Sequence, residues 1–130
     1  MSDYEHLIAE AGRARENAHA PYSNFRVGAA LRSTSGRVFG GCNVENATYG
    51  LTVCAERVAI FKAISEGERG FDAIAVVTDT ETLTPPCGAC RQLLWEFCGD
   101  VSVVLANMRG KQEVVRMRDL FPKPFDVSNL

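Results

Sequence analysis

The chain has 130 residues, which is enough for one domain spanning residues 1–130 around a single hydrophobic core. Its 46% of hydrophobic and 23% of charged residues are typical of globular proteins, and no apolar run approaches the ~20 residues that span a bilayer. The net charge of −2, without Lys or Arg clusters beyond pairs, argues against a nucleic acid as partner. We therefore expect neither a nucleic-acid nor a membrane partner.

The N-terminus and the cysteines indicate the compartment. Residues 1–6 contain no basic region followed by an apolar one, so no secretory signal is evident. Five cysteines are an odd number, which fits poorly with a disulfide framework. In a reducing compartment such residues bind metals, act in catalysis or are buried. We expect a cytoplasmic protein.

The first part of the chain predicts one helix and one hairpin. Apolar residues recur at helical spacing over residues 3–19, and Ser2 and Glu5 have the spacing of a capping box. Residues 26–32 and 38–44 flank a turn-like segment and are expected to pair as a β-hairpin.

The rest of the chain alternates helical and strand patterns. We expect helices at 54–66 and 87–98, buried strands at 73–78 and 101–106, a short strand at 114–115 and a helical turn at 118–121. Gly67 and Gly99 follow the two helices as stop signals. The order α-β-β-α-β-α-β-β-α predicts an α/β fold with helices on both faces of one mixed sheet.

Two short stretches, CAER at 54–57 and PPCGACR at 85–91, bring three thiols and one carboxylate together. Thiolates of Cys54, Cys87 and Cys90 could hold a zinc ion and leave its fourth position open for water. Glu56 follows the first cysteine closely and could carry that water's protons without being a ligand. Both cysteine groups fall at predicted helix N-termini, where the helix dipole stabilises thiolates.

This pattern, a ligand-x-Glu followed by Pro-Cys-x-x-Cys, resembles the short, three-cysteine cytidine deaminases. The resemblance covers nearly the whole chain, including PYSNFRVGAAL at 21–31, GCNVENATYG at 41–50 and LTVCAERVAIFKA at 51–63. It implies a three-layer α-β-α sandwich around a five-stranded mixed sheet and one Zn²⁺ per chain. The implied reaction is the hydrolytic deamination of free cytidine and deoxycytidine to uridine and deoxyuridine with release of ammonia, a step of pyrimidine salvage. It further implies a homotetramer with pockets shared between subunits.

The resemblance also implies roles for five residues around a nucleoside. Asn43 and Glu45 match the pair that bonds the ribose hydroxyls, and Phe25 matches an aromatic that packs on the base. The backbone N–H of Ala55 matches the donor to the O2 carbonyl. Phe125 resembles an aromatic that reaches a neighbouring subunit's pocket.

Two arginines lie beside the proposed metal ligands. Three thiolates and one Zn²⁺ carry a net charge of −1, which weakens the metal as a Lewis acid. Arg57 and Arg91 could offset that charge by hydrogen-bonding sulfur. In the family the arginine of the CAER motif has this part, so the resemblance implies it for Arg57.

Other interpretations explain less of the pattern. A structural zinc site would need a fourth ligand, for which Cys42 or Cys98 are candidates, although both are more typical of buried small hydrophobes. A redox dithiol accounts for Cys87 and Cys90 alone. Deamination of another aminopyrimidine or of a polynucleotide, and a non-catalytic zinc-stabilised interaction domain, remain as alternatives. The Asn43 and Glu45 pair disfavours another aminopyrimidine, and the acidic balance disfavours a polynucleotide.

Overall fold

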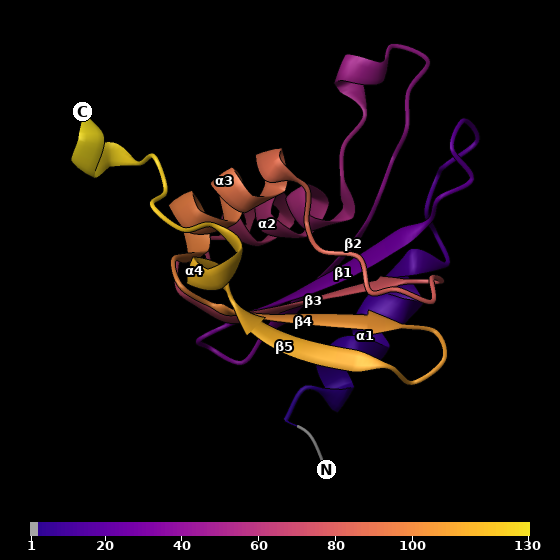
Figure 1. Cartoon of the computed structure of the whole chain (residues 1–130), viewed down its shortest axis with the longest axis horizontal. Helices are drawn as coiled ribbons and strands as arrows, with labels where there is room; N and C mark the ends of the chain where they lie inside the picture. Colours follow the sequence, from indigo (N-terminus) through magenta and orange to yellow (C-terminus); the bar gives the residue numbers. More distant parts are fainter. Residues whose placement is uncertain (1–2) are drawn as a thin grey trace.

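Five strands form one mixed sheet in the order β2-β1-β3-β4-β5 in the computed structural model, which describes residues 3–130 (Figure 1). The strands are β1 (Val27–Ser33), β2 (Val38–Cys42), β3 (Phe71–Thr78), β4 (Ser102–Asn107) and β5 (Gln112–Arg116). β3 and β4 run parallel at the centre, and the other three neighbouring pairs are antiparallel. The hairpin of β1 and β2 is therefore confirmed.

Helices cover both faces of the sheet, as the order of elements predicts. They are α1 (Glu5–Arg15), α2 (Ala55–Ser65), α3 (Gly88–Cys98) and α4 (Met117–Leu120), with short 3-10 turns η1 (Tyr49–Leu51) and η2 (Val127–Asn129). Figure 1 shows α1 on one side of the sheet and α2, α3 and α4 on the other. The predicted fold class is confirmed.

Strand residues alternate between the two faces because successive side chains of a strand point in opposite directions. In β3, Ile74 and Val76 pack in the core under α2 and α3, whereas Ala75 and Val77 pack under α1. β3 and β4 are buried along nearly their whole length, which explains their continuous apolar runs.

The first helix is shorter than expected. α1 ends at Arg15, and the chain continues to Ala18 in tighter turns whose N–H groups bond carbonyls three residues back. Ser2 of the expected capping pair lies outside the described residues.

Between residues 3 and 130, no helix combines the length and the apolar character needed to cross a membrane.

Close packing of strand β2 against α2 fixes the start of that helix. A Cβ atom on Gly41 would lie 2.7 Å from the Ala55 carbonyl oxygen and 2.6 Å from the Ala59 nitrogen. Glycine at this position therefore lets the first turn of α2 approach the sheet directly.

Candidate active site

Three cysteines meet where two helices begin. Cys54 is the N-cap of α2 and Cys87 the N-cap of α3, and both have extended backbone dihedral angles. Cys90 lies in the first turn of α3 and is fully buried. Because α2 and α3 pack on the same face of the sheet, the two N-termini converge with their N–H groups and dipoles.

The spacing of the three sulfur atoms suits one zinc ion. All three lie within 4.8 Å of one another, and the Sγ atoms of Cys54 and Cys87 are 4.0 Å apart. Tetrahedral zinc with Zn–S bonds of about 2.3 Å places its sulfur ligands about 3.8 Å apart. All five cysteines are free thiols, so these three are available as ligands.

The donor set leaves a coordination position open. Among residues 3–130, the group of candidate ligands holds these three cysteines and neither Cys42 nor Cys98. A structural zinc site is normally closed by a fourth protein ligand, whereas a catalytic site keeps one position for water or substrate. The donor set therefore fits a catalytic zinc site better than a structural one.

Arg57 supplies positive charge at the sulfur cluster. Its Nη2 donates to Cys54 Sγ at 3.5 Å and to the Thr52 carbonyl at 3.2 Å. Hydrogen bonding to Cys90, reinforced by Arg57, lowers the pKa of the Cys54 thiol to about 5. The hydrogen bond with Cys54, together with burial, raises the pKa of the Cys90 thiol above its usual range. Holding all three sulfurs as thiolates thus needs further positive charge, which a divalent cation provides.

Glu56 presents a buried carboxyl group beside the cysteines. It is the second residue of α2 and only 5% exposed. Burial, joined by the negative charge of Cys54, raises the pKa of Glu56 to about 7. A carboxyl group in such a place, facing a cavity, is a candidate for proton transfer.

A cavity of about 180 Å³ opens above these groups. Six of the predicted site residues, Cys54 and Cys87 among them, belong to its lining. The full lining is Phe25, Val27, Asn43, Thr52, Cys54, Ala55, Glu56, Val76, Thr84, Pro85 and Cys87. The fold therefore brings together, around one cavity, the groups that the sequence predicts: the Phe25 ring, the Asn43 amide, the Ala55 backbone, the Glu56 carboxyl group and two of the thiols. Cys90 lies buried beneath them.

Asn43 holds the wall that carries Phe25. Its Oδ1 accepts a hydrogen bond from the Val27 N–H at 2.9 Å, and its Nδ2 donates to the Phe25 carbonyl at 2.7 Å. The preceding residue, Asn24, has a φ of 58°, a left-handed conformation that Asn tolerates better than most residues. An amide has two donor hydrogens and two lone pairs on oxygen, so Asn43 retains one of each for a ligand.

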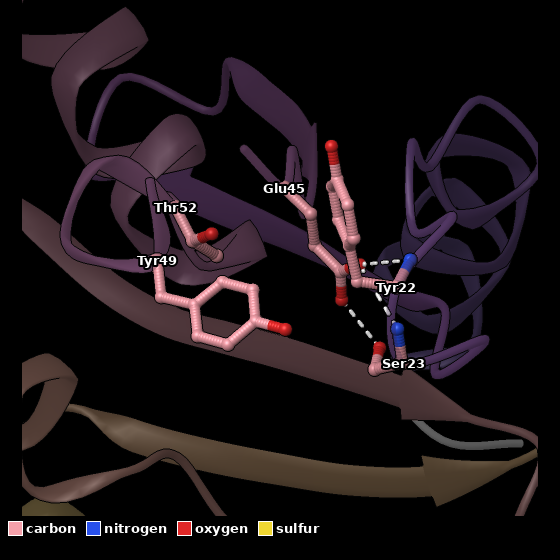
Figure 2. A pocket seen from close by; sticks show the side chains of 5 residues that line it. All are labelled: Tyr22, Ser23, Glu45, Tyr49 and Thr52. Carbon is pink, nitrogen blue, oxygen red and sulfur yellow. Dashed lines mark hydrogen bonds between the residues drawn. The ribbon is translucent and has the colours of Figure 1, made fainter. Parts of the chain in front are cut away.

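Glu45 lies in a neighbouring cavity of about 360 Å³, lined also by Tyr22, Ser23, Tyr49 and Thr52 (Figure 2). Its Oε1 accepts from the N–H groups of Tyr22 at 2.9 Å and Ser23 at 3.1 Å, and its Oε2 accepts from the Ser23 hydroxyl. The Ser23 hydroxyl and these N–H groups lower the pKa of Glu45. Thr52 lines both cavities, which are therefore adjacent.

Two predicted residues, Arg91 and Phe125, line neither cavity, and neither has a described bond to the sulfurs. Arg91 donates to the carbonyl oxygens of Pro86 at 2.8 Å and Leu120 at 2.7 Å, so its described hydrogen bonds go to backbone and not to sulfur. Phe125 is 60% exposed on the C-terminal segment and lines neither cavity of its own chain.

Several wall residues had no signal in the sequence. Thr84 lines the cavity, and its hydroxyl joins those of Thr78 at 3.4 Å and Thr80 at 3.3 Å. Asn107 at the end of β4 donates to the Thr80 carbonyl at 2.9 Å. This network ties the loop that leads to Cys87 to the ends of the two central strands. Single threonines in a loop do not predict such contacts from the sequence.

Comparison with known proteins agrees with this geometry. Residues 1–107 match the model of the cytidine and deoxycytidylate deaminase zinc-binding region. A cytidine deaminase of Sporosarcina psychrophila is 51% identical over 98% of this chain and 95% of that protein, and one of Halalkalibacterium halodurans is 51% identical over 98% of both. A cytidine deaminase structure from Burkholderia pseudomallei aligns with a TM-score of 0.90 and 53% identity over 96% of this chain and all of its own. The chain belongs to the zinc-binding cytidine and deoxycytidylate deaminase family.

Proposed function

We propose that this protein catalyses the zinc-dependent hydrolytic deamination of free cytidine and deoxycytidine to uridine and deoxyuridine, with release of ammonia, in pyrimidine salvage. One observation carries the proposal. The buried carboxyl group of Glu56 lines the same small cavity as the thiols of Cys54 and Cys87, at the N-terminus of α2. A proton carrier and an open three-cysteine metal site thus face one enclosed space.

Glu56 is the proton carrier of the proposed reaction. Cys54, Cys87 and Cys90 would hold one zinc ion per chain, which would lower the pKa of bound water and so supply the nucleophile for C4 of the pyrimidine. Glu56 takes up the proton that the water loses, delivers it to N3 and passes a second proton to the leaving amine. Of the two protons of the water, one thus ends on N3 and the other, from the hydroxyl group added at C4, on ammonia, while the oxygen becomes the new carbonyl oxygen.

The remaining wall residues orient the base and the sugar. The Phe25 ring packs on the base, and the Ala55 N–H at the start of α2 donates to the O2 carbonyl. Asn43 uses its free donor and lone pair for the ribose, and Glu45 has one of about four carboxylate acceptor positions left for a hydroxyl. The two adjacent cavities offer room for base and sugar side by side.

Assembly completes the pocket. By itself the cavity of about 180 Å³ falls below the roughly 300–1,000 Å³ that ligand pockets commonly have, so a nucleoside also needs the neighbouring cavity. Exposed aromatic side chains surround the neighbouring cavity, where Tyr22 is 52% and Tyr49 75% exposed. We propose a homotetramer in which the 130 residues of each chain act as one catalytic domain and Phe125 enters a neighbouring subunit's pocket. Five free thiols and the absence of a basic cluster support a cytoplasmic enzyme acting on nucleosides, with no nucleic-acid or membrane partner.

The test is conversion of cytidine by the purified zinc-loaded protein, followed as the change of the ultraviolet spectrum to that of uridine with ammonia measured alongside. Glu56→Gln keeps the size of the side chain and removes its proton transfer. We expect it to retain zinc and fold while turnover falls by about 10²–10⁴. Near-normal turnover in this variant would remove Glu56 from the mechanism. Inert wild-type protein with full zinc would favour the non-catalytic interaction domain.

A further inference from the structure

The last nine residues, 122–130, form a segment that we call the C-terminal strap. It follows α4, and in Figure 1 it extends past α3 to the end of the molecule. Its apolar side chains are not buried by its own chain: Phe125 is 60%, Val127 75% and Leu130 92% exposed. Hydrophobic burial within the chain therefore does not explain why the strap has a defined path.

Polar side chains of α3 hold this part of the chain. Arg91 Nη1 donates to the Leu120 carbonyl at 2.7 Å, immediately before the strap. Gln92 Nε2 donates to the Phe125 carbonyl at 2.8 Å, and Trp95 Nε1 donates to Asp126 Oδ2 at 2.8 Å. Two of these bonds fall on Phe125 itself and on the residue next to it. The backbone of Phe125 is thus fixed while its ring is left exposed.

The strap is also stiffened locally. Asp126 caps η2 through its other carboxylate oxygen, which accepts from the Ser128 N–H at 2.9 Å, and Asn129 Oδ1 accepts from the Asp126 N–H. Pro122 and Pro124 flank Lys123, whose φ of 52° turns the chain sharply. Chain ends without such ties are usually poorly ordered.

We propose that Gln92 and Trp95 are positioning residues that set the direction of the Phe125 ring for the nucleoside pocket it enters. This inference rests on the role of Phe125 in the proposed function. The two residues touch no substrate, and they act through the backbone of Phe125 and the carboxylate of Asp126. Their effect on the reaction therefore exists only as long as Phe125 carries its ring.

A double-mutant cycle isolates that dependence. Trp95→Phe keeps an aromatic side chain and removes the N–H donor, and Phe125→Leu removes the ring it is proposed to position. We expect Trp95→Phe to lower kcat/KM for cytidine by about two- to twelvefold, the equivalent of one net hydrogen bond, mainly through KM. In the Phe125→Leu background the same change should have no further effect. The proposal would be overturned if the double variant lost kcat/KM by the product of the two single losses, or if Trp95→Phe alone kept the wild-type kcat/KM.

Matched variants guard against a merely structural effect. Gln92→Met, which is nearly isosteric and lacks the donor, should act like Trp95→Phe and show the same dependence on Phe125. Ser128→Ala removes a hydroxyl bonded to the same Asp126 carboxylate but leaves the bond to α3, so its kcat/KM should stay near that of wild type. A loss in Ser128→Ala equal to that in Trp95→Phe would point to general disorder of the strap and against positioning by α3.

A fluorescence measurement separates this inference from the proposed function. Trp95 is the only tryptophan of the chain, so its emission reports directly on the contact with the strap. Asp126→Leu, which keeps a similar shape and removes both acceptor oxygens, should shift the emission and increase quenching by acrylamide. If wild-type protein converts cytidine but Phe125→Leu is unimpaired, the positioning role fails while the activity stands. If Asp126→Leu leaves the emission and quenching unchanged, the contact between Trp95 and Asp126 is wrong, whatever the activity.

Discussion

Arg57 lies one helical turn from Cys54 at the start of α2, and its Nη2 donates to the Cys54 sulfur at 3.5 Å. The Nε of the same guanidinium is buried without a hydrogen-bond partner among residues 3–130. A buried donor normally finds an acceptor, so this nitrogen has capacity left for the sulfur cluster or its ligand. We therefore propose that Arg57 is the cation that balances the thiolates, the role that the resemblance implies for it.

The first prediction follows from that charge. Arg57→Gln keeps a hydrogen-bond donor but removes the positive charge, so the sulfur cluster becomes more negative and a bound metal becomes a weaker Lewis acid. We expect kcat for cytidine to fall about 10–100-fold, with a smaller change in KM. Arg57→Lys, which retains the charge, should lose less. The measurement is steady-state kinetics of the variants at matched zinc content. Unchanged kcat in Arg57→Gln would mean that the helix dipoles alone compensate the negative charge of the thiolates.

The second prediction concerns the metal ligands. Alanine at Cys54, Cys87 or Cys90 removes one of three sulfurs that lie within 4.8 Å of one another, so each variant should lose zinc or hold it weakly. Cys42→Ala and Cys98→Ala change cysteines outside the cluster and serve as controls that keep one zinc per chain. Zinc content per chain is measured by elemental analysis after dialysis against a weak chelator. Full occupancy in Cys54→Ala would contradict this ligand set.

Much of the fold is predictable because the local signals agree with the tertiary structure. Gly67 and Gly99 follow their helices with positive φ values of 95° and 73°, which glycine adopts more readily than other residues. The buried strands appear as continuous apolar runs because helices cover both faces of the sheet. The strand order, with β1 between β2 and β3, depends on contacts between distant segments and was not predictable from any one of them.

The site is predictable where its chemistry lies within short motifs. Cys54, Glu56, Cys87 and Cys90 come together because each motif begins a helix, and the two helices share one face of the sheet. The partners of Glu45 were not predictable. Tyr22 and Ser23 lie 23 and 22 residues earlier, and their backbone N–H groups carry no sequence signal.

The third prediction tests how β2 positions α2. Gly41→Ala would place a Cβ atom 2.7 Å from the Ala55 carbonyl oxygen, so the start of α2 must shift. Overpacking of this kind commonly costs about 1–3 kcal/mol, and here it displaces the helix that carries Glu56. We expect a lower melting temperature and weaker zinc retention.

Gly40→Ala is the matched control for this change. Its Cβ would meet only ordinary contacts, with the Ala14 Cβ at 3.4 Å and the Ala29 carbonyl oxygen at 3.9 Å. Thermal unfolding and zinc content of the two variants should therefore differ clearly. Equal behaviour would show that the approach of Gly41 to α2 does not set the position of the site.

The last prediction concerns what the pocket recognises. If Asn43 and Glu45 bond the ribose, their remaining hydrogen-bonding groups lack a partner whenever the sugar is missing. A buried polar group without a partner costs about 1–3 kcal/mol, which applies to Asn43 because it is only 8% exposed. Free cytosine should therefore be a much poorer substrate than cytidine. Phosphate on the sugar should also weaken catalysis, because the Glu45 carboxylate repels it and the sequence has no run of Lys or Arg longer than a pair to receive it.

The measurement is kcat/KM for cytosine, cytidine, deoxycytidine, cytidine monophosphate and a short single strand. Glu45→Ala should reduce the value for cytidine more than that for cytosine and so narrow the gap between them. Asn43→Ala should do the same but also lower the melting temperature, since it leaves the Val27 N–H and the Phe25 carbonyl without their partner. A gap that persists in both variants would contradict sugar recognition by this pair. A single strand that matches cytidine would instead favour a polynucleotide deaminase.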